Sequence, residues 1–142
     1  MFNLQLGSAG GEHIEMNIIL PSHADYDEAW IKVPTILEIG AFGGSIAPMF
    51  EVSDFTRFLP ELQRVYKTLS GQAILDSRER QLYFTVAGNG RGGLVVEGYA
   101  YSQATYGTKL QFEYALDQTF LVAPLGILHQ LTEEWKKVIS YL

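Results

Sequence analysis

The residue pattern closest to a chemical motif is the glycine-rich segment Gly88-Asn89-Gly90-Arg91-Gly92-Gly93, which satisfies G-x-G-x-x-G. In a dinucleotide site such glycines follow a strand and open a helix, and the N-terminus of that helix holds the pyrophosphate. Here residues 94–99 have the composition of another strand. Because no helix follows, no helix dipole is available for a phosphate. A glycine-rich hairpin therefore accounts for the segment better than a nucleotide site does.

The strongest candidate for a metal or partner site is the acidic segment 23–28, His-Ala-Asp-Tyr-Asp-Glu. Clustered carboxylates beside an imidazole can bind a hard or borderline cation. The spacing does not match an EF-hand loop, however, and a solvated loop or the acidic rim of a partner site is the better interpretation. We therefore predict Asp25, Tyr26, Asp27 and Glu28 as partner-binding residues, and we predict no metal or other cofactor.

The residue types that most often act in catalysis are scattered along the chain. The three histidines, at positions 13, 23 and 129, have neither H-x-x-x-H nor H-E-x-x-H spacing, and no serine lies in a G-x-S-x-G turn. His129 is expected to be a half-buried structural residue of a helix. The absence of cysteine excludes disulfides, thiolate zinc sites and cysteine nucleophiles. We predict no catalytic residue, while a site assembled in space from scattered residues stays open as an alternative.

Three tyrosines, Tyr83, Tyr99 and Tyr101, fall on one face of two neighbouring predicted strands. If that face meets solvent, the rings form a platform suited to a protein partner. The alternative, which we favour from the sequence, is that the rings belong to the core and that their hydroxyls reach its rim.

Strands and helices must position these residues. Residues 109–120 place apolar side chains at the even positions from Leu110 to Leu116 and polar ones between them, which is the period of a half-buried strand. Apolar residues then recur with a helical period, which predicts a C-terminal helix over about residues 122–141.

A first helix is predicted over about residues 54–70, where apolar side chains again recur with a helical period. Ser53 suits its N-cap and Gly71 its C-terminal stop. Pro60 lies inside the pattern and should kink or restart the helix, but the apolar period continues across it.

The remaining segments alternate like strands with short connections, which favours antiparallel pairing. Pro34, within the segment 30–39, indicates an edge strand or a bulge because proline cannot donate to a strand ladder. The chain has no repeat or linker, so residues 1–142 are predicted to form a single domain. The predicted fold class is α+β: a curved antiparallel meander of about six to seven strands with both helices packed on one face.

Charge and hydropathy narrow the range of partners. The 142 residues carry a formal net charge of -6, which argues against nucleic-acid binding because that needs a basic surface. An acidic surface instead favours a basic protein partner. No apolar run approaches the roughly 18 residues of a membrane helix, and the start lacks the pattern of a signal peptide. We expect a soluble, cytoplasmic protein without a membrane partner.

Three segments occur in an order that resembles a known family: residues 25–33 (Asp-Tyr-Asp…Trp-Ile-Lys-Val), 58–71 (Phe-Leu-Pro-Glu-Leu…Leu-Ser-Gly) and 110–119 (Leu-Gln-Phe-Glu-Tyr…Asp-Gln-Thr). This order is similar to that of the small bacterial domain family that includes the WapI-type immunity proteins. The resemblance covers most of the chain and carries no catalytic signature. It implies a non-enzymatic binding protein, which in the WapI case neutralises a co-produced toxin.

The sequence is therefore compatible with two classes of function. The first is a non-enzymatic protein-binding module of the immunity-protein type, whose acidic surface would suit a basic toxin. The alternative is a small-molecule-binding domain or an enzyme of unknown substrate, which would need a concave pocket with a few convergent polar groups. A homo-oligomer that pairs an exposed strand edge or the tyrosine face is a third arrangement.

Overall fold

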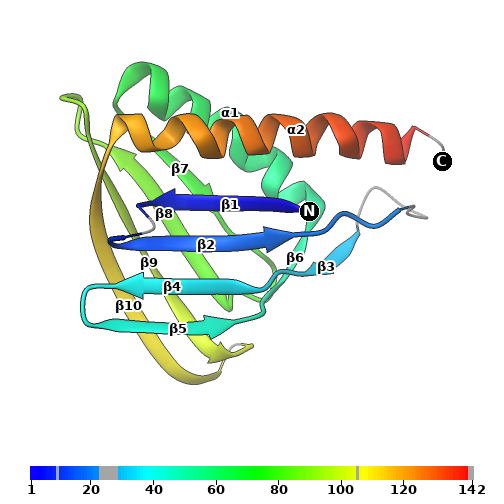
Figure 1. The fold of residues 1–142 in the computed structure, drawn as a ribbon, viewed down its shortest axis with the longest axis horizontal. Helices are drawn as coiled ribbons and strands as arrows, with labels where there is room; N and C mark the ends of the chain where they lie inside the picture. Colours follow the sequence, from blue (N-terminus) through cyan, green and yellow to red (C-terminus); the bar gives the residue numbers. More distant parts are fainter. Residues whose placement is uncertain (9, 23–28, 105, 141–142) are drawn as a thin grey trace.

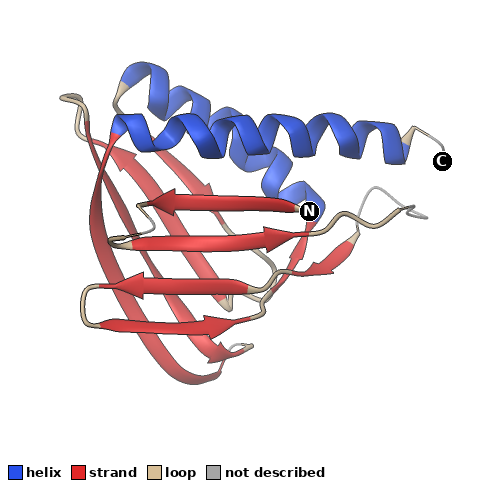
Figure 2. Cartoon of the chain, in the orientation of Figure 1, coloured by secondary structure: helices blue, strands red, loops and turns tan. Residues whose placement is uncertain are grey.

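The computed structural model describes residues 1–8, 10–22, 29–104 and 106–140. Two antiparallel sheets face each other, and two long helices lie side by side along one edge of both (Figures 1 and 2). One helix packs against the edge strand of one sheet, and the other helix packs against the edge strand of the second. Sheets and helices together enclose one core.

The two larger sheets are built from strands of 4 to 12 residues that are joined mostly by hairpins. The first sheet has the order β1-β2-β4-β5 and consists of β1 (Phe2–Gly7), β2 (His13–Ile18), β4 (Thr35–Ile39) and β5 (Phe42–Ile46). The second has the order β10-β9-β8-β7 and consists of β7 (Gln72–Leu75), β8 (Leu82–Gly88), β9 (Gly93–Gln103) and β10 (Tyr106–Asp117). A separate pair is formed by β3 (Trp30–Lys32) and β6 (Met49–Glu51).

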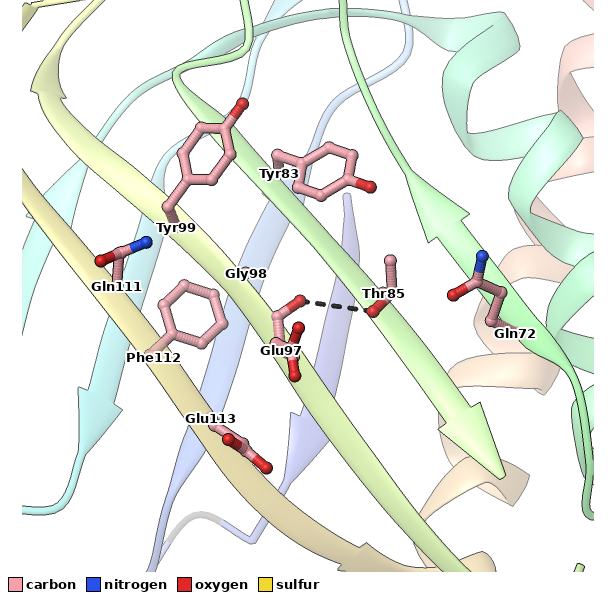
Figure 3. Close-up of a pocket in the computed structure, with 9 residues that line it drawn as sticks. All are labelled: Gln72, Tyr83, Thr85, Glu97, Gly98, Tyr99, Gln111, Phe112 and Glu113. Carbon is pink, nitrogen blue, oxygen red and sulfur yellow. Dashed lines mark hydrogen bonds between the residues drawn. The ribbon is translucent and has the colours of Figure 1, made fainter. Parts of the chain in front are cut away.

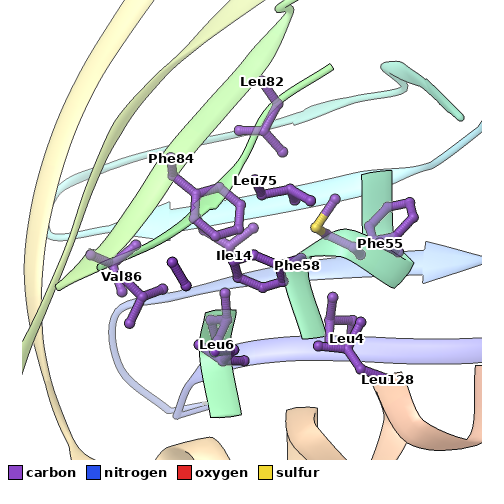
Figure 4. Close-up of a cluster of buried hydrophobic side chains, with 14 of the residues drawn as sticks. Leu4, Leu6, Ile14, Phe55, Phe58, Leu75, Leu82, Phe84, Val86 and Leu128 are labelled. Carbon is purple, nitrogen blue, oxygen red and sulfur yellow. The ribbon is translucent and has the colours of Figure 1, made fainter. Parts of the chain in front are cut away.

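The core fills the space between the two sheets and the helices (Figure 4). Phe58 of the first helix meets Phe84 of β8 edge to face, with ring centroids 6.0 Å apart, and each fully buried side chain of this size contributes about 1.5–3 kcal/mol to stability. Tyr114 of β10 donates a hydrogen bond of 2.8 Å to the carbonyl of Leu6 in β1. This bond ties the two sheets together, and burial of Tyr114 raises the pKa of its hydroxyl.

Helix α1 (Val52–Thr68) is one continuous helix that contains Pro60. It begins two residues before the predicted start, and the predicted N-cap Ser53 is wrong, because Glu51 holds that position with an extended backbone. The carboxylate of Asp54 accepts a hydrogen bond of 2.8 Å from the backbone N–H of Glu51. An acidic side chain in the first turn also suits the positive end of the helix dipole.

The glycine-rich segment lies against the C-terminal end of α1. Leu69, not the predicted Gly71, ends the helix in a left-handed conformation with φ of 58°. The backbone N–H of Gly90 donates to the carbonyl of Leu69, and that of Gly88 donates to the carbonyl of Gly71 at 3.0 Å. The segment therefore satisfies the carbonyl of the residue that ends α1 and the carbonyl that directly precedes β7. This arrangement is the reverse of a phosphate site and agrees with the hairpin interpretation.

The strand and the helix predicted for the C-terminal part of the chain are confirmed. Asp117 ends β10, and its carboxylate accepts a hydrogen bond of 2.9 Å from the backbone N–H of Thr119, which lowers the pKa of Asp117. A short 3-10 helix, η1 (Gln118–Leu121), leads into helix α2 (Val122–Ile139). The buried residues of α2 have the predicted period: Pro124, Leu125, Leu128, Leu131 and Trp135. In the described ranges, no helix is long and apolar enough to cross a bilayer.

The predicted fold class, α+β with antiparallel strands and two amphipathic helices, is confirmed, but the strands are more numerous than about six to seven. The described ranges contain ten strands in three sheets. Pro34 accounts for one of the additional strands, because it divides segment 30–39 into β3 and β4, which then join different sheets. The second half, β7 to β10, is the predicted meander.

Candidate functional site

The predicted partner-binding residues Asp25, Tyr26, Asp27 and Glu28 lie outside the described residues. The same is true of His23. Their role as an acidic rim stays a prediction. Among the described residues, candidate sites lie on the second sheet and at the N-terminus of α1.

The tyrosines lie on the outer face of the second sheet and not in the core. Leu82, Phe84 and Ala100 point into the core, so Tyr83 and Tyr99, which alternate with them, point out of the opposite face of the second sheet. The tyrosines are half-buried by one another rather than by the core. The favoured assignment to the core was therefore wrong, and the platform alternative describes this face.

A hollow of about 560 Å³ lies on this outer face (Figure 3). We call it the tyrosine hollow. Strands β7 to β10 contribute its lining: Gln72, Tyr83, Thr85, Glu97, Gly98, Tyr99, Gln111, Phe112 and Glu113. Most of the side chains that point outward here are polar, whereas pockets for small molecules are lined mainly by apolar groups. The size of the hollow admits a small molecule, but its lining is closer to that of a protein-binding surface.

The aromatic part of the hollow is ordered by direct contacts. Tyr83 and Tyr99 are cross-strand partners, and their rings stack with centroids 5.3 Å apart and planes inclined by 22°. Tyr101 meets Tyr99 edge to face at 5.6 Å. The ammonium group of Lys109 lies 4.7 Å from the centroid of the Tyr99 ring, a cation–π geometry. The stacked rings thus lie half-buried on the outer face of the sheet, and the ring of Tyr99 already attracts a cation.

The acidic part of the hollow is a pair of glutamates on neighbouring strands. Glu97 of β9 and Glu113 of β10 stand directly opposite each other in the antiparallel register. Figure 3 shows them side by side. Within the described ranges neither carboxylate has an ion pair or a side-chain hydrogen bond. Two like charges directly opposite each other destabilise a sheet, so we expect a repulsion between these glutamates in the free protein.

A second hollow, of about 470 Å³, lies at the N-terminus of α1. We call it the charged crevice. The chain that follows β7 and the start of α1 provide its lining: Glu51, Asp54, Arg57, Asp76, Ser77, Arg78 and Arg80. Three carboxylates and three guanidinium groups meet in it. No residue of this crevice was predicted as functional, since its members come from two segments that are distant in sequence.

The charges of the crevice pair with one another. Arg57 contacts Asp54 at 2.6 Å, and Arg80 contacts Asp76 at 3.0 Å. Arg78 lies 2.9 Å from Oε1 of Glu51 as an ion pair without hydrogen-bond geometry. Burial raises the pKa of Asp54, and the backbone N–H of Glu51 and the charge of Arg57 partly offset that rise. The crevice is therefore electrically balanced.

The histidines do not form a site in the described structure. His13 is buried in β2, where its Nδ1 is hydrogen-bonded to the carbonyl of Gly11 at 2.8 Å. His129 is exposed rather than half-buried, and its Nε2 lies 2.7 Å from the amide nitrogen of Gln63, which links α2 to α1. No group of three or more His, Cys, Asp or Glu side chains suited to a metal ion occurs in the described part of the chain.

Comparison with models of protein families finds a match for this chain. The model of the immunity protein WapI-like family matches residues 5–141, nearly the whole chain. The chain belongs to this WapI-like family. Membership confirms the resemblance seen in the sequence and supports an immunity-protein role in general. Neither the curated proteins nor the solved structures give a match.

For a WapI-like immunity protein, the two hollows differ in what they can do. The charged crevice has its charges satisfied and holds the start of α1. The tyrosine hollow combines half-buried, stacked aromatic rings with two carboxylates that have no ion pair in the described ranges, which is a surface chemistry suited to a protein partner. Glu113 could have been found from the sequence, since it shares the polar face of a predicted strand. Its position opposite Glu97 could not, because it depends on the register.

Proposed function

We propose that this chain is a non-enzymatic immunity protein that binds a toxin produced by the same cell and blocks it through a stoichiometric complex. Membership of the WapI-like immunity protein family carries this proposal. The net charge of -6 supports a basic toxin as the partner, because opposite charges steer association and complement each other in the interface. We place this activity in the cytoplasm, where a chain without cysteine needs no disulfide.

The decisive experiment mixes the purified chain with the toxin that its source cell co-produces and follows toxin activity as a function of the molar ratio. We expect inhibition that is complete at one chain per toxin and that weakens as salt is raised. After separation under denaturing conditions and refolding, the toxin should regain its activity with an unchanged mass. A toxin that stays active in an excess of the chain would refute the immunity role, and a toxin with an altered mass would identify an enzyme instead.

The acidic segment provides a second test of the same proposal. We propose Asp25, Tyr26, Asp27 and Glu28 as part of the rim that contacts the toxin, on the ground of their clustered charge. The triple variant Asp25→Asn/Asp27→Asn/Glu28→Gln should slow association with the toxin by about tenfold at low salt and by less at high salt. A control triple variant with the same change in charge is available in exposed residues elsewhere: Glu12→Gln/Glu133→Gln/Glu134→Gln.

Equal rates for the two triple variants would show that net charge alone steers the toxin and that the acidic segment has no local role. A slower rate confined to the segment 23–28 would support it as a contact.

A further inference from the structure

The tyrosine hollow has the chemistry of a receptor for one positively charged side chain. We infer that an arginine of the protein partner inserts into this hollow, with its guanidinium group between Glu97 and Glu113 and beside the stacked rings of Tyr83 and Tyr99. This inference rests on the proposed function, because the arginine belongs to the bound toxin. It adds a place and a recognition chemistry, which family membership alone does not provide.

The unpaired glutamates are the first argument. Every carboxylate of the charged crevice lies within 3.0 Å of an arginine nitrogen: Asp54 at 2.6 Å, Glu51 at 2.9 Å and Asp76 at 3.0 Å. Glu97 and Glu113, which face each other across β9 and β10, have no such partner in the described ranges. Since opposed like charges cost stability in a sheet, a cation placed between them would remove a repulsion and gain two attractions.

The aromatic wall is the second argument. Lys109 extends from β10 over the rings of Tyr99 and Tyr101, with its ammonium group 4.7 Å and 5.6 Å from their centroids. Lys109 and Tyr101 lie beside the lining of the hollow, and this internal contact shows that tyrosine rings on this face of the sheet attract a cation. Tyr83, stacked on Tyr99, enlarges the aromatic surface on the side toward β7.

Arginine fits this combination better than lysine does. A guanidinium group is planar and can stack on a tyrosine ring, and its forked N–H donors match carboxylate oxygens in pairs. The amides of Gln72 and Gln111 and the hydroxyl of Thr85, which line the same hollow, add neutral groups that can bind the rest of the arginine or its backbone. Buried arginine side chains of this kind are common centres of protein interfaces.

The experiment uses the full chain and a short probe in place of the toxin. The probe is the peptide acetyl-Gly-Arg-Gly-amide, and its matched control contains citrulline, which has nearly the same shape without the charge. The chain has eight tyrosines, whose ring signals are followed by NMR after ¹³C labelling and assigned with Tyr83→Phe and Tyr99→Phe. We expect the arginine peptide alone to shift the signals of Tyr83 and Tyr99.

The glutamates are tested by the double variant Glu97→Gln/Glu113→Gln. It should weaken binding of the arginine peptide by about tenfold, because two charge-assisted contacts are lost. The double variant Glu133→Gln/Glu134→Gln changes the same charge on the exposed face of α2 and should leave peptide binding unchanged. The backbone spectrum of each variant shows whether its fold is intact.

Three outcomes would overturn the inference: equal shifts with the citrulline peptide, tyrosine signals that stay in place, or equal binding by the two double variants. Tyrosine shifts that depend on the concentration of the chain alone would identify a second copy as the occupant instead. Failure here is separable from failure of the proposed function. A chain that neutralises the toxin as well with Glu97→Gln/Glu113→Gln refutes the hollow only, whereas a chain that binds the arginine peptide but no toxin refutes the immunity role only.

Discussion

The tyrosine hollow and the charged crevice are similar in volume, about 560 Å³ and 470 Å³, and each contains carboxylates. They differ in whether each carboxylate has a cationic partner. In the crevice every carboxylate has an arginine beside it, and Asp54 also accepts the backbone N–H of Glu51. In the hollow Glu97 and Glu113 oppose each other without a cation in the described ranges, and the half-buried tyrosines stack on each other on the outer face of the sheet.

This difference separates a structural use of charge from a binding use. Paired charges at the first turn of α1 satisfy the helix N-terminus and anchor the loop after β7. Charges held in opposition cost the free protein stability, a cost that the proposed arginine of the partner would offset. A hollow and a crevice of similar size thus differ in whether their charges are paired within the protein. The following four predictions test that contrast.

The largest effect is expected where the backbone shapes the hollow. Gly98 of β9 lies so close to β8 that an added Cβ would overlap the carbonyl oxygen of Tyr83 and come within 2.6 Å of the Cα of Phe84. We expect Gly98→Ala to lower the free energy of unfolding by about 3 kcal/mol, since the two strands must separate to admit the methyl group. Urea denaturation measures the loss.

Gly126 is the matched control for this substitution. It lies in α2, where an added Cβ meets nothing within 4 Å, so Gly126→Ala should stabilise the protein by about 0.5–1 kcal/mol through helix propensity. A loss below about 1 kcal/mol in Gly98→Ala would show that β8 and β9 can move apart. The shape of the hollow would then not depend on their close approach.

The second prediction concerns the pairing of the crevice. The Glu51 side chain is 9% exposed and has Arg78 at 2.9 Å, whereas Asp76 is 33% exposed and has Arg80 at 3.0 Å. Arg78→Met should cost about 1.5 kcal/mol, because it leaves a buried carboxylate unpaired and removes the cation–π contact with Trp30.

Arg80→Met provides the comparison, with an expected cost below about 1 kcal/mol for an exposed pair. Thermal unfolding of both variants at one pH measures the difference. Equal losses would mean that burial of Glu51 does not matter and that the crevice is only a set of surface ion pairs.

Some of these features depend on local periodicity and others on how distant segments pack or pair, and only the first kind can be predicted from the sequence. Helix α2 and strand β10 depend on local periodicity, and both were predicted from it. The crevice depends on how α1 packs beside the loop after β7, which no local pattern encodes. The opposition of Glu97 and Glu113 depends on the β9–β10 register, which shifts at an irregularity between Tyr106 and Lys109.

The tyrosine face was misjudged for a different reason. Tyrosine is compatible with either face of a strand, since it has an apolar ring and a polar hydroxyl. The neighbouring residues of β8 indicate the orientation. Leu82, Phe84 and Val86 are more apolar than Tyr83 and Thr85, and they are the residues of β8 that point into the core. Comparing both faces of one strand would have given the observed orientation.

The third prediction uses pH to compare two carboxylates. Burial raises the pKa of Asp54 above 3.8, so between 3.8 and the raised value the folded state binds more protons than the unfolded state. The stability that Asp54 contributes should therefore fall as the pH rises through this interval, an effect smaller than that of Arg78→Met. Asp54→Asn should remove this slope from the measured free energy of unfolding.

Asp117 should show the opposite sign, because hydrogen bonds from Thr119 lower its pKa below 3.8. Its contribution is present above pH 3.8 and is lost as the pH falls through the lowered value. Asp117→Asn should therefore flatten a slope of the reverse direction in the same titration. Slopes of one sign for both residues would show that burial does not govern the ionisation of Asp54.

The smallest effect is the most diagnostic one for the contrast between hollow and crevice. Glu97→Gln should raise the free energy of unfolding by about 0.5 kcal/mol, because it ends the repulsion with Glu113 across the two strands. Adding Glu113→Gln should raise it little further, since the repulsion is already gone, so the two substitutions are not additive. The gain should shrink in high salt, where exposed charges are screened.

Glu133→Gln/Glu134→Gln is the control for the double variant Glu97→Gln/Glu113→Gln, because it makes the same change in charge and removes the 3.1 Å pair of Glu133 with Lys136 rather than a repulsion. It should give no gain. If Glu97→Gln instead destabilises the protein, the glutamates of the hollow hold the sheet as those of the crevice hold α1, and the two regions use charge in the same way. If it stabilises the free protein and weakens the arginine peptide together, folding and binding are opposed at this one pair of residues.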